Sequence, residues 1–258
     1  MSQIDVNTFI GTYPFRDIGA WDAATLVATC AAAGATSAWV SHLGAAYWTD
    51  PASGNAALYH AADAHSMLRP IPAVHPGRPG WESVLDEAQR RGVPAVRCDP
   101  TWYGLPPAGT EVQRLADAAG TRGIPVMMCM RLEDIRQRHP NDAAQDLPTW
   151  AVRTLIRAAR DTRFIITHAD RDFIEQVHFG STPEEAERIL WDISCIWGPP
   201  EDHLELLLRT VGTSRFTYGT GVPLRLAETA MAKIDLLQLA PVDRERLLSS
   251  NLGAFCNR

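Results

Sequence analysis

Short apolar runs alternate with longer amphipathic segments along the whole chain. The runs are rich in Val, Ile, Phe and Trp and are bounded by Gly, Pro and Asp, which is typical of buried strands. The eight runs that we predict to be strands are IDVNTFI (4–10), TSAWVSHL (36–43), RPIPAVHP (69–76), PAVRCDP (94–100), IPVMMCM (124–130), RFIITHA (163–169), RILWDIS (188–194) and RFTYGT (215–220).

The segments between these runs carry apolar residues at the spacing of three to four that predicts helices. In segment 21–34, Asp22 stands at a capping position, Leu26 and Cys30 fall on one face, and Gly34 ends the pattern. The same pattern predicts helices in segments 81–92, 110–123, 148–161 and 201–212, and two further helices, 224–237 and 241–251, close the chain.

Strands that alternate with helices run parallel, because each return to the same end of a sheet needs a helical crossover. Eight such units in a chain of 258 residues predict an α/β fold, a (β/α)8 or TIM barrel, formed by one domain over residues 1–258. A doubly wound open sheet is the alternative, but no GxGxxG motif follows the first strand.

The bulk composition narrows the function classes further. The formal net charge is −6, so no basic excess indicates nucleic-acid binding, and no apolar run approaches the ~20 residues that span a membrane. The five cysteines are odd in number and include no CxxC pair, which favours reduced thiols. The first strand begins too early to leave room for a signal peptide, so we predict a cytoplasmic protein and leave a homo-oligomer open.

In such a barrel the carboxyl ends of the strands and the loops after them carry the chemistry. The polar residues that fall at these ends are Asn7, His42, His75, Arg97, Asp99, Cys129, Arg131, His168, Asp192 and Ser194, with Arg16, Arg136, Asp170 and Arg225 in the loops just beyond. The remaining histidines of interest lie in helical or connecting segments, where we assign them to the surface or to packing: His60, His65, His178 and His203.

Several stretches, taken in order, form a set that is known from one group of barrels. They are IDVNTFIG in the first strand, IPVMMCM in the fifth, FIITHAD in the sixth, RFTYGTGVP in the eighth and the tail APVDRERLLSSNLGAF, in which Asn251 begins a short packed turn. Together they resemble the amidohydrolase superfamily, specifically its amidohydrolase-related branch of metal-dependent hydrolases and decarboxylases. The resemblance covers nearly the whole chain and implies hydrolysis of C–N or C–O bonds, or decarboxylation.

Typical members of that family hold a metal with two histidines on strand one, one on strand five, one on strand six and an aspartate on strand eight. The matching positions here are Asn7, Phe9, Cys129, His168 and Gly221, so the resemblance retains only His168. A divalent ion needs three or four suitable ligands, and Phe and Gly supply none, so we expect no metal cofactor. The alternative is zinc or another divalent metal in a rebuilt site formed by His42, His75, Cys129, His168 and Asp192.

The arginines point to an anionic small-molecule substrate. Arg97 and Arg131 follow apolar strands, where a buried charge needs a partner such as a carboxylate or phosphate. Pairing with nearby acidic side chains is the alternative for each arginine, and plain loop packing is the alternative for the aromatic residues. The residues that we predict to bind substrate are Asn7, Arg16, His42, Arg97, Arg131, Trp102, Tyr103, Trp197 and Cys129.

These residues favour a small-molecule hydrolase that works without a metal. We predict His168 as the general acid or base, because imidazole titrates near neutral pH, with Asp192 or Asp99 orienting it and His75 as a further candidate. Two alternatives stay open: a decarboxylase or other lyase on the same scaffold, and an inactive barrel that serves as a binding protein. A polar, water-accessible pocket at the strand tips would indicate an enzyme, whereas apolar side chains filling that space would indicate a relic.

Overall fold

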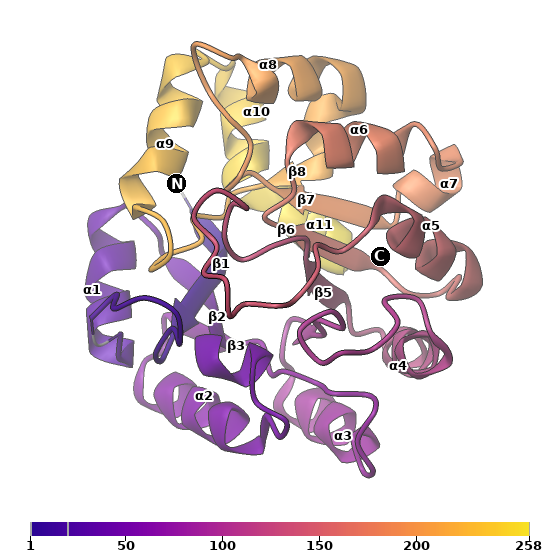
Figure 1. Cartoon of the computed structure of the whole chain (residues 1–258). Coiled ribbons are helices and arrows are strands. Elements are labelled where there is room, and N and C mark those ends of the chain that lie inside the picture. Colours follow the sequence, from indigo (N-terminus) through magenta and orange to yellow (C-terminus); the bar gives the residue numbers. More distant parts are fainter. Residues whose placement is uncertain (1, 20, 258) are drawn as a thin grey trace.

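Within residues 2–19 and 21–257, which the computed structural model describes, eight parallel strands lie at the centre and helices surround them (Figure 1). The strands are β1 (Ile4–Ile10), β2 (Ser37–His42), β3 (Leu68–Pro70), β4 (Val96–Arg97), β5 (Val126–Cys129), β6 (Phe164–Thr167), β7 (Ile189–Asp192) and β8 (Phe216–Thr217). The predicted (β/α)8 barrel is therefore confirmed, with each strand inside or overlapping its predicted run.

Helices follow the strands in regular alternation. The α-helices are α1 (Ala23–Ala32), α2 (Ala52–Ala64), α3 (Glu82–Arg91), α4 (Thr110–Thr121), α5 (Thr149–Ala158), α6 (Arg171–His178), α7 (Pro183–Ala186), α8 (His203–Leu207), α9 (Ala227–Leu236), α10 (Pro241–Glu245) and α11 (Asn251–Cys256). Shorter helical turns are η1 (Leu43–Ala46), η2 (Leu208–Gly212), η3 (Thr213–Arg215) and η4 (Arg246–Ser250).

Hydrogen bonds at two seams close the strands into a barrel. β1, β2 and β3 pair in one group and β4 to β8 in another. Ala73, just after β3, bridges to Arg97 of β4. At the other seam the Val6 amide donates to the Tyr218 carbonyl at 3.1 Å, and the Gly221 amide donates to the Asn7 carbonyl at 2.8 Å. All eight carboxyl ends therefore open on the same face of the molecule.

Local sequence signals explain the first helix. The Asp22 side chain accepts a hydrogen bond from the Thr25 amide at 2.8 Å and so caps α1. Leu26 and Cys30 are buried against β1 and β2, and Gly34 leaves the helix at a φ of +88°, a conformation that glycine adopts without strain. The predicted cap, face and end of this helix are confirmed.

The C-terminal tail closes the end of the barrel opposite the strand tips. Leu252 and Phe255 of α11 pack on inward-facing residues of the strands, among them Val6 and Met127. The Asn251 side chain donates to the Thr213 carbonyl at 2.7 Å and to the Phe216 carbonyl at 2.9 Å, which ties the tail to β8. This end is packed solid, so an opening in the barrel can only lie at the carboxyl ends of the strands.

Candidate active site

A cavity of about 290 Å³ opens at the carboxyl ends of the strands, and it lies to one side of the barrel axis. Every lining residue follows one of the strands β5 to β8: Arg131, Asp134, Arg136, Gln137, His168, Asp170, Arg171, Asp172, Cys195, Trp197, His203 and Arg225. Strand-tip cavities are the usual location of active sites in this fold. The polar pocket that would indicate an enzyme is therefore present in one half of the barrel mouth.

The other half of the mouth is filled by apolar side chains. Phe9, Tyr13, Leu43, Ala46, Cys129 and Leu132 form a buried cluster over the ends of β1, β2 and β5, which we call the apolar plug. Trp102, Tyr47 and Phe15 pack on its outer side. The feature expected of an inactive relic is thus also present, but only on the side of the mouth where the cavity does not reach.

His168 is the innermost polar residue of the cavity. It follows β6 directly and adopts a φ of +57°, which is rare for a residue other than glycine. Its amide donates to the Asp192 Oδ1 atom at 2.9 Å, and its Nδ1 atom lies 2.9 Å from the Arg131 carbonyl oxygen. These bonds hold the backbone in the unusual conformation and fix the plane of the ring.

The hydrogen bond at Nδ1 decides which ring nitrogen carries the proton. A carbonyl oxygen only accepts, so Nδ1 of His168 must donate, and in the neutral ring Nε2 is then the unprotonated nitrogen. Burial lowers the pKa of His168 well below its usual value, and the positive charges of Arg225 and Arg97 lower it further. The ring is therefore neutral near pH 7, with a free lone pair on Nε2.

Gly221 makes the space into which Nε2 points. A Cβ atom at this position would lie 2.8 Å from His168 Nε2 and 3.2 Å from the Cδ atom of Arg225, and the backbone φ is +77°. Any other residue would therefore be strained and would collide with the imidazole. Within the part of the chain that the structure describes, Nε2 is buried and has no hydrogen-bond partner.

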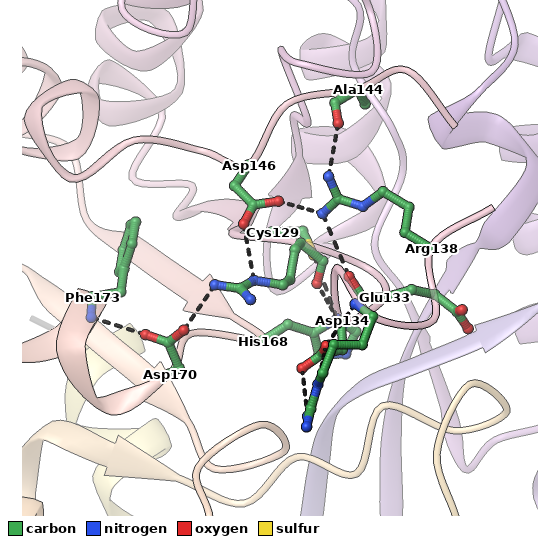
Figure 2. Close-up of polar contacts among 11 residues, drawn as sticks. Cys129, Glu133, Asp134, Arg138, Ala144, Asp146, His168, Asp170 and Phe173 are labelled. Carbon is green, nitrogen blue, oxygen red and sulfur yellow. Dashed lines mark hydrogen bonds and ion pairs between the residues drawn. The ribbon is translucent and has the colours of Figure 1, made fainter. Parts of the chain in front are cut away.

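Most arginines of the cavity are neutralised by neighbouring carboxylates. Arg131 contacts Asp170 at 2.8 Å and Asp146 at 3.1 Å, and Figure 2 shows these two carboxylates on different sides of the guanidinium that they share. Arg136 pairs with Asp134 at 2.8 Å, and Arg171 pairs with Glu175 at 3.0 Å. The alternative of local ion pairing therefore describes these three arginines.

Arg225 differs from the other arginines of the cavity. Its Nε atom is buried without a hydrogen-bond partner, and it makes no ion pair with any residue in 2–19 or 21–257. The residue follows β8 and stands beside His168, whose pKa it lowers. It was recognised in the sequence as a loop arginine but was not included among the predicted substrate-binding residues.

Arg97 lies inside the barrel and outside the cavity lining. It is 3% exposed, its Nη1 atom is 3.6 Å from Asp99 Oδ2, and its guanidinium lies 4.8 Å from the centre of the Phe9 ring. Its Nε atom donates to Ser41 Oγ at 2.9 Å, and its Nη2 atom donates to Asn7 Oδ1 at 3.2 Å. This buried arginine already has the partners that a substrate anion was expected to supply.

Asn7 joins Arg97 to the base of the cavity. Its Nδ2 atom donates to Asp192 Oδ2 at 2.7 Å, and Asp192 in turn accepts from the His168 amide. All three side chains are buried, and burial raises the pKa of Asp192. Asp192 therefore contacts the backbone of His168 rather than its ring, so it positions the residue without touching Nδ1.

The other two predicted histidines lie apart from His168. His75 stacks on Tyr103 with ring centres 4.2 Å apart, and it lines a separate hollow with Asp50 and Arg78. His42 lies against Trp48, with ring centres 4.9 Å apart and ring planes tilted by 44°. The structure does not bring His42 and His75 into the cavity, although both follow strands as predicted.

Three more predicted residues border the mouth. Trp197 is 47% exposed and forms a wall of the cavity, where His203 stacks on it. Arg16 lies at the rim and pairs with Glu133 at 2.5 Å. Cys129 belongs to the apolar plug, and burial raises the pKa of its thiol well above the usual value, which opposes nucleophilic attack.

Sequence reasoning missed several cavity residues, of which His203 and Cys195 are two. His203 was assigned to the surface or to packing, yet it lines the cavity at the start of α8. Cys195 lies directly after the strand-end residue Ser194, so its place just beyond a strand was the available signal. The Lys233 ammonium donates to the carbonyls of Ile193, Ser194 and Ile196, and thus fixes the loop that carries Cys195 and Trp197.

The positions that match the family's metal ligands do not fit a metal ion. Phe9 and Gly221 offer no donor atom, the Asn7 amide is bound to Arg97 and Asp192, and His168 Nδ1 is bound to a carbonyl. Across residues 2–19 and 21–257, no group of three or more His, Cys, Asp or Glu side chains is placed to hold a metal. The expectation that the protein works without a metal stays a prediction.

None of the described helices combines the length and apolar character that a bilayer crossing requires. No protein-family model matches the sequence, and no curated protein matches it.

Solved structures do resemble the chain over its whole length. The 2,6-dihydroxybenzoate decarboxylase from Rhizobium has a TM-score of 0.75 at 11% identity, with 99% of this chain and 98% of that chain covered. The 5-carboxyvanillate decarboxylase from Novosphingobium aromaticivorans, with bound manganese, has a TM-score of 0.74 at 11% identity, covering 100% and 97%. A probable 2-pyrone-4,6-dicarboxylic acid hydrolase from Acinetobacter baumannii, with citric acid bound, has a TM-score of 0.67 at 11% identity and covers 100% of both chains.

These proteins include hydrolases and decarboxylases of the kind that the sequence resemblance named. At this level of identity the likeness shows a shared fold, and it confirms the barrel independently of the strand pattern. The chain thus shares its barrel fold with these hydrolases and decarboxylases.

Proposed function

We propose that the protein is a small-molecule hydrolase that acts on an anionic substrate in the cavity over β5 to β8, with His168 as its acid–base residue. The observation that carries the proposal is the buried, unpartnered Nε2 atom of His168, which points into a polar cavity. A buried polar atom without a partner is costly, and such atoms concentrate at functional sites. A bound substrate or water would supply the missing donor.

The protonation state of His168 favours hydrolysis over decarboxylation. A neutral imidazole with a free Nε2 lone pair can take a proton from a water molecule as that water attacks a carbonyl carbon. The same proton can then be passed to the departing oxygen or nitrogen atom, which leaves the imidazole neutral again. Decarboxylation instead requires a proton to be delivered to carbon, and a ring whose pKa is lowered starts without that proton.

The charge around the cavity supports an anionic substrate. Arg131, Arg136 and Arg171 are paired with carboxylates, whereas Arg225, beside His168, has no carboxylate partner among residues 2–19 and 21–257. Guanidinium groups bind carboxylates and phosphates through paired hydrogen bonds. The structural neighbours include enzymes named for carboxylated substrates, which is consistent with this charge.

The proposal can be tested with a panel of esters, lactones and amides that carry a carboxylate. Hydrolysis is followed by the appearance of the new carboxylic acid product. We expect His168→Gln to remain folded and to lose at least about 100-fold in kcat, because a positioned acid–base group contributes roughly 10²–10⁴-fold. His178→Gln is the matched control, since His178 lies on α6 outside the cavity. Release of carbon dioxide instead of acid, or full activity of His168→Gln, would overturn the proposal.

Independence from metal is a further part of the proposal. Protein purified without added metal should contain far less than one equivalent of Zn, Mn or Ni, and a chelator should leave its activity unchanged. Elemental analysis checks the first expectation and an assay with a chelator checks the second. One equivalent of metal, together with loss of activity on chelation, would show that the site is built differently.

A further inference from the structure

Two unsatisfied polar groups belong to side chains that both lie against Gly221. His168 Nε2 and Arg225 Nε are both buried, and among the described residues neither has a hydrogen-bond partner. A Cβ atom on Gly221 would contact both side chains, at 2.8 Å from His168 Nε2 and 3.2 Å from Arg225 Cδ. The two groups therefore border the same small space at the inner end of the cavity.

The two groups have opposite hydrogen-bonding character. The Arg131 carbonyl takes the proton on His168 Nδ1, so Nε2 can only accept. The guanidinium of Arg225 can only donate, and it is always charged. A ligand that satisfies both must present an anionic oxygen to Arg225 and an O–H or N–H group to His168.

The acidic residues of the cavity do not compete for Arg225. Asp134 is bound to Arg136, and Asp170 is bound to Arg131 and also caps α6 by accepting from the Phe173 amide. Asp172 is exposed in the first turn of α6. The space between His168 and Arg225 therefore keeps its positive charge and its single acceptor.

We infer that this site selects oxyanions that carry their own hydroxyl group, on the charged group or next to it, and rejects fully deprotonated oxyanions of the same shape. An oxygen without hydrogen would place its lone pairs against the lone pair of His168 Nε2. The inference rests on the proposed function for the identity of the cavity as the substrate site, and it adds the substrate class. Hydroxy acids and acid phosphates belong to this class, whereas sulfates do not.

Inorganic phosphate and sulfate test the inference directly, because they have nearly the same shape and only phosphate carries an O–H group at pH 7. Calorimetric titration of the full-length protein at constant ionic strength should show phosphate binding at least ~10-fold more tightly than sulfate, since a buried acceptor left without a donor costs about 1–3 kcal/mol. Equal binding, tighter sulfate binding, or no binding of either anion would overturn the inference.

Variants assign the selectivity to its residues. Arg225→Met should abolish binding of both anions, and His168→Phe should reduce phosphate binding to the level of sulfate while the melting temperature confirms folding. Arg171→Met is the matched control, because Arg171 lines the same cavity but is paired with Glu175. Phosphate binding that Arg225→Met does not weaken, or that Arg171→Met abolishes, would place the anion elsewhere and refute the assignment.

The binding test of the inferred selectivity and the turnover test of the proposed reaction have independent outcomes. Selectivity for phosphate without any hydrolysis in the substrate panel would leave the inferred site standing and remove the proposed reaction. Hydrolysis that depends on His168, without any preference for phosphate over sulfate, would leave the reaction standing and remove the inferred selectivity.

Discussion

The two halves of the barrel mouth differ in whether the space above the strand ends is filled and in whether the arginine there is paired. Over β1 and β2 the strand tips are covered by the apolar plug, and the buried guanidinium of Arg97 beneath it donates to Ser41 and Asn7 and lies 3.6 Å from Asp99. Over β5 to β8 the tips border a cavity, and the charge on Arg225 has no partner among the described residues. Buried charge is compensated on one side and left available on the other.

The difference explains why similar residue types have different roles. An enclosed arginine stabilises the fold only through its partners, and its removal leaves those partners unpaired. An arginine on a cavity wall adds little to folding, but it is available to a ligand. Arg97 and Arg225 both lie at or just after the end of a strand, so the surroundings of each side chain decide which of these roles it has.

The largest expected effect is on stability, and it separates the two arginines. Arg97→Met should lower the free energy of unfolding by about 4 kcal/mol, because it leaves Asp99 and Asn7 buried without their partner. Arg225→Met should change it by less than about 0.5 kcal/mol, as is usual for residues that lack a partner in the fold. Chemical denaturation of both variants measures the difference, and similar losses in both would contradict the contrast between the halves.

The next effect compares an aromatic residue from each half. Phe9→Ala should cost about 3 kcal/mol of stability, because Phe9 is 1% exposed and its loss leaves a hole in the apolar plug. Trp197→Ala should cost less than about 1 kcal/mol, since nearly half of that side chain faces solvent. Denaturation curves again give the answer, and a tolerant Phe9 would mean that the plug is loosely packed.

The fold could be predicted from the sequence because strand and helix patterns are local. The run PAVRCDP predicts a strand wherever it stands, and the structure confirms a short one, β4, between flanking prolines that cannot extend the ladder. Alternation of strands with helices then leaves few arrangements other than a parallel barrel.

The site could be predicted only in part, because side-chain partners come from distant segments. His168 and Arg131 were identified by their places at strand ends, and the structure brings both to the cavity. Arg97 donates to Ser41 and Asn7, which lie on other strands, whereas Arg225 has no such partner in the part of the chain that the structure describes. The residues next to each arginine in the sequence therefore do not indicate whether its side chain has partners in the fold.

The smallest effect concerns the seam that joins the two halves. Asp5 of β1 accepts from the Thr220 amide at 3.0 Å and from the Thr220 hydroxyl at 2.7 Å, just beyond β8. Burial raises the pKa of Asp5 from 3.8 to about 7, although these hydrogen bonds lower it. The folded protein therefore binds a proton here that the unfolded chain releases above pH 4, and the contribution of Asp5 to stability falls as the pH rises from about 4 to about 7.

Asp5→Asn should remove this dependence, because the amide keeps an acceptor for the Thr220 amide but does not titrate. Between pH 5 and pH 7 the variant should gain stability relative to the wild type by up to about 1.4 kcal/mol per pH unit. Buried groups that are not coupled to Asp5, such as His168, are common to both proteins and cancel in the difference. Denaturant titrations of both proteins at several pH values measure that difference in stability. A difference that does not change with pH would show that Asp5 stays ionised in the folded protein, and the seam would then hold a buried negative charge.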